Sequence, residues 1–239
     1  MANLRTNNLS GEQGQNAYRG SVHFPQVHNS TDYLVLDPSL NPANQFNFLH
    51  NGTTDFTIEF WTYFNDDQVG RELLNKWKTG AQPGQNEWWV GTQNYGLNRL
   101  SFYVSVNNSH HGIVADDESI SSNQWHHVAA VKEGANLFLY VDGIIVGSYN
   151  NNSLLNGIDN VGRDLSIARR PNSSSFNGNI RVDETRLWNE ARSQNQIQDF
   201  MNSELSGNET NLISSNSPAI SGKYALFGFG NSEIYATFK

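Results

Sequence analysis

The chain has 239 residues, of which 12% are aromatic and only 16% are charged, against about 25% charged residues in an ordinary globular protein. Its 15 Lys and Arg against 23 Asp and Glu give a net charge of -8, so it lacks the positive field that binds nucleic acid or an anionic membrane. With no cysteine, disulfides and thiolate metal sites are excluded. No apolar run reaches the roughly 18 residues of a membrane span, and residues 1–15 contain no apolar block typical of a signal peptide.

Short strands separated by turn residues run along most of the chain. The clearest covers 55–64, where Phe56, Ile58 and Phe60 recur at the period of two that places them on one face of a sheet. Asp142 and Gly143 form a two-residue connection between two strand-like segments, which indicates a β-hairpin. The other predicted strands cover residues 21–24, 32–36, 72–77, 87–91, 99–106, 112–115, 125–132, 136–141, 144–149, 165–168 and 178–188.

One helix is predicted, over residues 192–205. Ser193 and Gln196 have the spacing of a capping box, and Gly207 is a stop signal. The apolar stripe of this helix consists of Ile197, Phe200, Met201 and Leu205. Beyond the helix, the remaining strand candidates are 224–229, as a closing strand, and 233–238.

Many short strands with one short helix predict an all-β fold, a two-sheet antiparallel jelly-roll sandwich with one short C-terminal helix. Residues 1–17 are predicted to be an extended polar N-terminal arm, and 18–206 to be the jelly-roll domain. Residues 207–239 are predicted to be a C-terminal segment whose one or two strands complete the sandwich or contact another subunit.

Three segments carry a resemblance to a known family. They are 52–61 with the sequence GTTDFTIEFW, 125–143 with WHHVAAV followed by LFLYVDG, and 176–189 with FNGNIRVDETRLWN. In order and spacing they resemble the laminin-G-like or concanavalin A-like jelly-roll family, which includes the pentraxins and modules of bacterial and phage surface proteins. The resemblance covers about residues 20–205 and implies the concanavalin A-like fold. It does not fix a function, because this sandwich hosts lectins, adhesion modules, hydrolases and lyases.

The same resemblance implies a structural calcium ion. In many such sandwiches, calcium joins the N-terminal region to the last long strand through an aspartate and backbone carbonyls. Carried over to this chain, the ligands are Asp183 and the carbonyl oxygen of Gly52. A calcium ion needs about six to eight oxygen ligands, of which one aspartate supplies one or two.

Aromatic residues gather in a region rich in Gly, Asn and Gln. They are Trp77, Trp88, Trp89 and Tyr95, and His110 lies in a polar turn nearby in sequence. Carbohydrate recognition uses flat ring faces for the C–H surface of a sugar and amide side chains for its hydroxyls. We therefore predict that this set binds carbohydrate. Because successive strand residues face opposite sides of a sheet, at most one of Trp88 and Trp89 faces a ligand.

The remaining polar residues within the strands have structural interpretations. His126 and His127 are adjacent in a strand, so they point to opposite faces and do not chelate one ion together. Asp142 is explained by the turn that it forms. Glu59 is expected to be a partly buried, hydrogen-bonded carboxylate, with a place on a binding face as the alternative.

No catalytic pattern of a glycoside hydrolase is present. Hydrolases on this sandwich place carboxylates as Glu-x-Asp-x-Glu on one strand, and this spacing is absent. We therefore expect a non-catalytic, lectin-like binding or adhesion module, with a polysaccharide hydrolase or lyase as an alternative.

The expected context is the surface of a larger particle, such as a virion decoration or tail-fibre subunit, at the virion surface or outside the cell. A purely structural assembly subunit without glycan binding is the other alternative. The chain is expected to be a homo-oligomer or to contact neighbouring subunits, with residues 1–17 and 234–238 as contact segments.

The calcium expectation leads to a test by thermal unfolding. A ligand that binds only the folded state adds about 2.7 kcal/mol at a hundredfold excess over its Kd. The melting temperature should therefore be several degrees higher with calcium than with a chelator, measured by circular dichroism. Coincident melting curves would show that calcium does not stabilise the folded protein.

Overall fold

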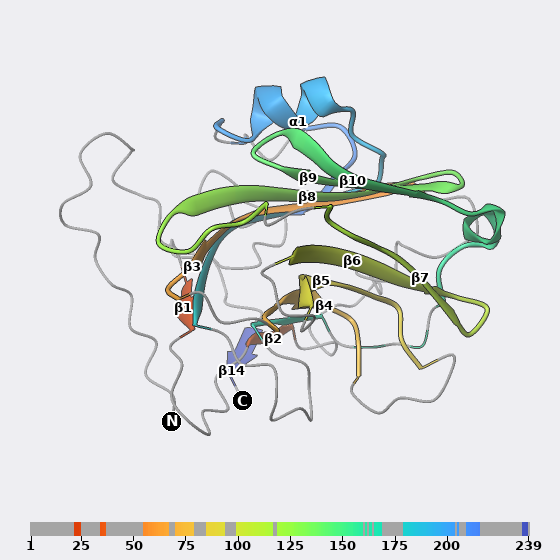
Figure 1. The fold of residues 1–239 in the computed structure, drawn as a ribbon, viewed down its shortest axis with the longest axis horizontal. Helices are drawn as coiled ribbons and strands as arrows, with labels where there is room; N and C mark the ends of the chain where they lie inside the picture. Colours follow the sequence, from red (N-terminus) through yellow and green to blue (C-terminus); the bar gives the residue numbers. More distant parts are fainter. Residues whose placement is uncertain are drawn as a thin grey trace.

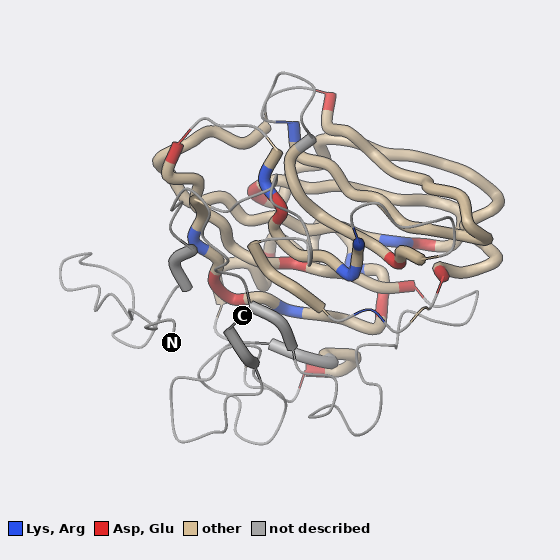
Figure 2. The backbone as a smooth tube through the Cα atoms, turned by 90° about the horizontal axis from the view of Figure 1, so that it is seen from below, with Lys and Arg blue, Asp and Glu red and all other residues tan. Residues whose placement is uncertain are grey.

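The fold is that of a computed structural model of the chain. The structure describes residues 22–24, 34–36, 55–66, 70–78, 85–93, 99–116, 119–159, 161, 163, 165–168, 179–203, 205, 209–215 and 236–238. Within them, basic and acidic positions are interspersed along the strands rather than gathered by sign (Figure 2).

Two antiparallel sheets face each other across the molecule (Figure 1). Sheet A has the strand order β1 (Val22–Phe24), β12 (Ile180–Trp188), β3 (Phe56–Phe64), β8 (Trp125–Glu133), β9 (Asn136–Val141) and β10 (Ile144–Asn150), and β13 (Leu212–Ser215) also pairs with β12. Sheet B has the order β14 (Ala236–Phe238), β2 (Leu34–Leu36), β11 (Ser166–Ile167), β4 (Glu72–Asn75), β5 (Trp88–Gln93), β6 (Arg99–Val106) and β7 (Ser109–Val114). The predicted jelly-roll sandwich is confirmed.

The period-two pattern of β3 places its apolar residues in the core between the sheets. Phe56, Ile58 and Phe60 are completely buried there, together with Phe102 and Val104 of β6 in the facing sheet. The rings of Phe56 and Phe102 meet edge to face, with their centroids 6.2 Å apart. This apolar burial is the main favourable term for pairing the two sheets.

One predicted strand needs correction, and one strand was missed. β7 begins at Ser109, three residues earlier than predicted, because Asn107 and Asn108 both adopt positive φ values, 48° and 67°, and close the hairpin in two residues. β13 was not predicted, since its composition is Asn- and Ser-rich, and its pairing with β12 defines it. The predicted strand 224–229 lies outside the described residues.

The last strand, β14, pairs with β2 of the same chain. It lies at one end of the order of sheet B, so it completes the sandwich and also forms an edge. Of the two predicted contact segments, 1–17 lies outside the described residues.

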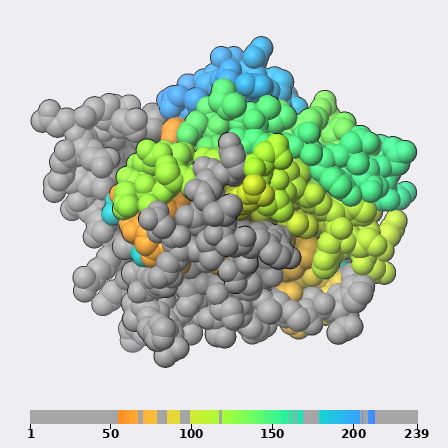
Figure 3. All heavy atoms as spheres, viewed as in Figure 1, coloured from red at the N-terminus to blue at the C-terminus, as the bar shows by residue number. Residues whose placement is uncertain are grey.

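Helix α1 (Gln194–Phe200) covers the outer face of sheet A (Figures 1 and 3). The predicted capping box is present: the Ser193 side chain accepts from the Gln196 backbone, and the Gln196 side chain accepts from the Ser193 backbone. The helix ends at the cap residue Met201 and is therefore shorter than the predicted 192–205. Beneath it, Ile197 packs on Ala129, Val131 and Tyr140 of sheet A.

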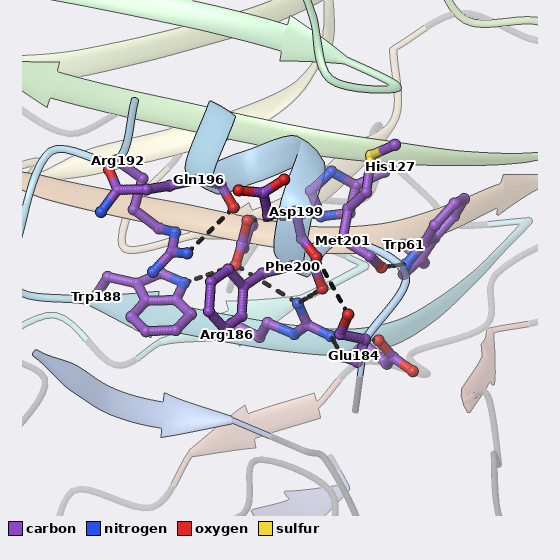
Figure 4. A network of polar contacts seen from close by, with 12 residues as sticks. Trp61, His127, Glu184, Arg186, Trp188, Arg192, Gln196, Asp199, Phe200 and Met201 are labelled. Carbon is purple, nitrogen blue, oxygen red and sulfur yellow. Dashed lines mark hydrogen bonds and ion pairs between the residues drawn. The ribbon is translucent and has the colours of Figure 1, made fainter. Parts of the chain in front are cut away.

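Side chains of sheet A satisfy the carbonyl oxygens at the end of α1 (Figure 4). The Arg186 guanidinium donates to the carbonyl oxygens of Phe200 at 2.7 Å and Ser203 at 2.8 Å. The Trp61 indole donates to the carbonyl oxygen of Met201 at 2.9 Å. These bonds replace intrahelical partners that the last turn of a helix lacks.

A buried carboxylate lies below this helix end. Glu59 is 0% exposed; its carboxylate accepts from the Trp188 indole at 2.7 Å and lies 3.7 Å from Arg186. Burial raises the pKa of Glu59, and the charges of Arg186 and Arg192 offset part of that rise. Burial lowers the pKa of the neighbouring His127 to about 3, so its imidazole is neutral. Glu59 is therefore a structural carboxylate and does not line an open binding face.

Replacing Arg186 tests whether this network fixes α1. Arg186→Met removes the guanidinium beside Glu59 and the donors to two helix-end carbonyls, so unfolding free energy should fall by about 3–5 kcal/mol. Urea unfolding followed by fluorescence measures it. The matched control Arg181→Met removes a half-buried arginine of the same strand that packs over Tyr63, and should cost about 1 kcal/mol or less. Equal losses in both variants would contradict this role.

Candidate functional site

Four of the five predicted carbohydrate-binding residues lie on or beside strands of sheet B. Trp77 follows β4, Trp88 and Trp89 begin β5, and His110 lies near the start of β7. Tyr95 lies outside the described residues. The structure therefore places three of the five predicted residues in sheet B and Trp77 directly after one of its strands, although not all on one face.

Trp88 and Trp89 point to opposite sides, as predicted. Trp88 is 1% exposed and belongs to the core between the sheets, so its ring does not face a ligand. Trp89 points to the outer face of sheet B and stacks on Tyr103, with ring centroids 5.4 Å apart and ring planes 3° from parallel. It is itself only 5% exposed. Trp89 is therefore a supporting element of this face rather than an open platform.

Gly112 explains why Tyr103 lies flat on the sheet. It is opposite Tyr103 in the register of β6 and β7. A Cβ atom at this position would collide with the Tyr103 ring. Only glycine leaves room for the ring to lie over the backbone of the neighbouring strand and to stack on Trp89.

Trp77 and His110 form a second ring pair at the end of sheet B. Their ring centroids are 4.6 Å apart, with the planes inclined by 55°. His110 is exposed, whereas Trp77 is 6% exposed. The tryptophan ring thus supports an imidazole whose other side faces solvent.

The β6–β7 turn beside His110 is held by a single carboxylate. Asp159 accepts from the backbone N–H of Asn107 at 2.8 Å and of Asn108 at 3.1 Å. It also accepts from the Ser105 hydroxyl at 2.6 Å. The side chains of Asn107 and Asn108 are exposed, so two amides project from a turn with a fixed backbone. We call Trp77, Asn107, Asn108 and His110 the hairpin-end surface.

A buried ion pair braces the strand ends below this surface. Lys76 and Glu87 are each 1% exposed, and the ammonium and carboxylate groups are 2.6 Å apart. The second oxygen of Glu87 accepts from the backbone N–H of Val161 at 3.2 Å and of Arg163 at 2.9 Å. These charge-assisted hydrogen bonds fix β4, β5 and the 161–163 segment against one another.

The calcium prediction gains no further ligand from the described residues. Asp183 is half-buried in β12, and its Oδ1 accepts from the Glu184 backbone at 2.8 Å. Gly52 lies outside the described residues. Across the part of the chain that the structure describes, no group of three His, Asp or Glu is placed to hold a metal. Calcium at Asp183 remains a prediction.

Sequence reasoning missed four residues described here, namely Asn107, Asn108, Asp159 and Tyr103. Asp159 lies 51 to 54 residues from the hairpin that it holds, and nothing in the local sequence marks it. Tyr103 had a usable signal, because it lies between the inward-facing Phe102 and Val104 on β6 and therefore faces outward.

Comparison with known proteins places the fold. The model of the concanavalin A-like lectin/glucanases superfamily matches residues 28–198. No curated protein sequence matches the chain. No described helix is long and apolar enough to cross a membrane.

Three solved structures illustrate the likeness. A proposed carbohydrate-binding protein from Bacteroides ovatus has a TM-score of 0.58 and 17% identity, with 89% of this chain and 53% of that chain covered. A structure from work on ganglioside-dependent cell entry of botulinum neurotoxin type C has a TM-score of 0.55 and 15% identity, covering 84% of this chain and 44% of that one. A heptameric SAP-like pentraxin from Limulus polyphemus has a TM-score of 0.50 and 17% identity, covering 74% and 78%. This chain thus spans about half the length of the first two.

Removing the Asp159 carboxylate should loosen the hairpin-end surface. Asp159→Ala deletes three hydrogen bonds to a carboxylate, so the unfolding free energy should fall by about 1–3 kcal/mol. Amide hydrogen exchange should accelerate at Asn107 and Asn108. The control Asp116→Ala replaces an exposed aspartate elsewhere and should change neither. Unchanged amide hydrogen exchange at both asparagines in Asp159→Ala would show that the turn is stable without the Asp159 carboxylate.

Proposed function

Because the chain belongs to the concanavalin A-like lectin/glucanases superfamily, we propose that it is a lectin-like module that binds carbohydrate and does not cleave glycosidic bonds. The observation that carries this proposal is the hairpin-end surface. There an exposed imidazole lies on a tryptophan ring beside two exposed amides on a turn fixed by Asp159.

This combination suits a sugar for chemical reasons. The imidazole ring offers a face to the C–H surface of a pyranose and also has a nitrogen that hydrogen-bonds with a hydroxyl. The amides of Asn107 and Asn108 each supply donors and an acceptor for further hydroxyls. Because the backbone of the turn is already ordered, little conformational entropy is lost when a ligand binds.

The related structures support the proposal at the level of fold. One is described as a proposed carbohydrate-binding protein, and another comes from work on toxin interaction with gangliosides. At 17% and 15% identity these statements concern those proteins, and residue positions are not transferred from them.

Glycosidic cleavage is left out of the proposal because two buried carboxylates of the sheets, Glu59 and Glu87, are engaged in structural contacts. Glu59 is completely buried and bonded to Trp188. Glu87 is buried in its ion pair with Lys76. Neither has the access to substrate that a general acid or nucleophile of a glycosidase needs.

The finer expectations concern context and assembly. A place on a virion or another particle is expected from the family resemblance, and a homo-oligomeric state from the contact segments 1–17 and 234–238, of which 1–17 lies outside the described part of the chain. They remain predictions, to be tested by sedimentation of the full chain and of a chain without residues 1–17.

A glycan array with matched variants tests the binding proposal. His110→Ala removes the exposed ring, and Asn108→Gly removes one amide while keeping the positive φ of 67°. Each variant should weaken the strongest glycan signal by about 5- to 100-fold, which corresponds to about 1–3 kcal/mol. The control Asn195→Ala, on the exposed side of α1, should bind like the wild type.

The outcomes separate two failures. If the wild type binds no glycan, the function is wrong. If it binds and both variants bind equally well, carbohydrate recognition stands but lies outside the hairpin-end surface.

A further inference from the structure

A serine, a histidine and an aspartate form a hydrogen-bonded chain at the other end of the sandwich. The Ser121 hydroxyl lies 3.1 Å from Nε2 of His126. Nδ1 of His126 lies 2.8 Å from Oδ2 of Asp142. β7 runs from the hairpin-end surface to the opposite end of the sandwich, where a short segment leads into β8 and His126. The three hydrogen-bonded residues are therefore remote from the hairpin-end surface.

The protonation of the imidazole follows from a backbone contact. The Ser121 backbone N–H donates to Nε2 of His126 at 3.2 Å, so Nε2 is the unprotonated nitrogen of the neutral ring. The ring proton therefore lies on Nδ1 and is donated to Asp142. This is the tautomer in which a histidine accepts the proton of a serine hydroxyl, and here the hydroxyl, the Ser121 backbone N–H and the Gln124 amide compete for the one lone pair of Nε2.

Asp142 is held firmly in the β9–β10 turn. Its Oδ1 accepts from the backbone N–H of His127 at 2.8 Å. Partial burial acts to raise the pKa of Asp142, but the hydrogen bonds from His126 and His127 outweigh it and hold that pKa below its usual value. From α1, Gln198 donates to the carbonyl oxygen of Gly143 at 2.9 Å and fixes the same turn. Asp142 thus stays ionised and oriented toward the imidazole.

Ser121 is exposed, so a substrate has access to its hydroxyl. The Gln124 side-chain amide contacts the Ser121 hydroxyl and lies 3.0 Å from Nε2 of His126. Because this amide donates to the Ser121 hydroxyl, it would have to turn away from it to donate to the carbonyl oxygen of an ester that Ser121 attacks. A side-chain amide in this position stabilises the negative charge that develops on that oxygen.

We propose that Ser121, His126 and Asp142 form a nucleophilic site that hydrolyses small acyl esters, such as acetyl esters. The Ser121 oxygen bonds to the ester carbonyl carbon while its proton passes to Nε2 of His126. The tetrahedral intermediate then breaks its bond to the alkoxy group, which leaves as an alcohol with that proton. Water cleaves the acyl-serine in the same two stages and releases the carboxylic acid.

The proposal is independent of carbohydrate binding. The expectation that the chain is not an enzyme was based on the absence of a glycosidase carboxylate pattern, which does not concern ester chemistry. Ser121 and His126 contact the reacting atoms, and Asp142 acts as a positioning residue through His126.

A fluorophosphonate probe on the full chain tests the site. It should label Ser121 in the wild type, identified by peptide mass spectrometry, and in the control Ser122→Ala, which alters the next serine. Ser121→Ala should take up no label. Because Ser121 is exposed, this variant should also retain the wild-type melting temperature. With p-nitrophenyl acetate, an acetyl group should be trapped on Ser121.

Two further variants distinguish a catalytic role of His126 and Asp142 from a purely structural hydrogen bond between them. His126→Gln and Asp142→Asn should lower the labelling rate by about 10²-fold or more, because general-base catalysis contributes about 10²–10⁴-fold. Circular dichroism confirms that each remains folded. Absence of label on Ser121 in the wild type, or equal labelling of Ser121→Ala, would overturn the proposal. Unchanged rates in folded Asp142→Asn would remove Asp142 from the site.

Discussion

The completely buried carboxylate of Glu59 constrains the outer face of sheet A. A buried carboxyl group needs hydrogen-bond donors nearby, and here Trp188 donates to it and Arg186 lies 3.7 Å away. Arg186 in turn donates to the carbonyl oxygens at the end of α1. The helix therefore lies where the Arg186 guanidinium can donate to the helix-end carbonyls and also lie beside the Glu59 carboxylate. These shared contacts determine how α1 covers the sheet.

Different kinds of interaction therefore stabilise the two faces of sheet A. The inner face packs Phe56, Ile58 and Phe60 against sheet B through apolar burial, which is non-directional. The outer face uses hydrogen bonds and ion pairs whose geometry is directional. Apolar burial holds the sheets together, and the polar network selects one position for the helix.

The strand pattern could be predicted from the sequence because the period of two is a local property. Phe56, Ile58 and Phe60 identify β3, and the Ser193 and Gln196 spacing identifies the start of α1. The end of α1 could not be predicted, because it depends on Arg186 from another strand. The same holds for the hairpin-end surface, where Asp159 reaches Asn107 across 52 residues. Alternation predicted that only one of Trp88 and Trp89 faces the core, but not that the outward ring would be covered.

The turn that contains Asp142 contacts α1. It lies at the end of the sandwich that is opposite to the hairpin-end surface. Gln198 of α1 donates to Gly143, and Asp142 precedes it and bonds to His126. A Cβ at residue 143 would come within 2.6 Å of the Gln198 side chain, so the helix and the turn fit only with glycine there. Arg186 holds the last turn of α1, so the buried network around Glu59 supports the helix whose Gln198 contacts this turn. The geometry at His126 therefore rests on contacts far along the chain, and residues that are purely structural hold the proposed nucleophilic site in place.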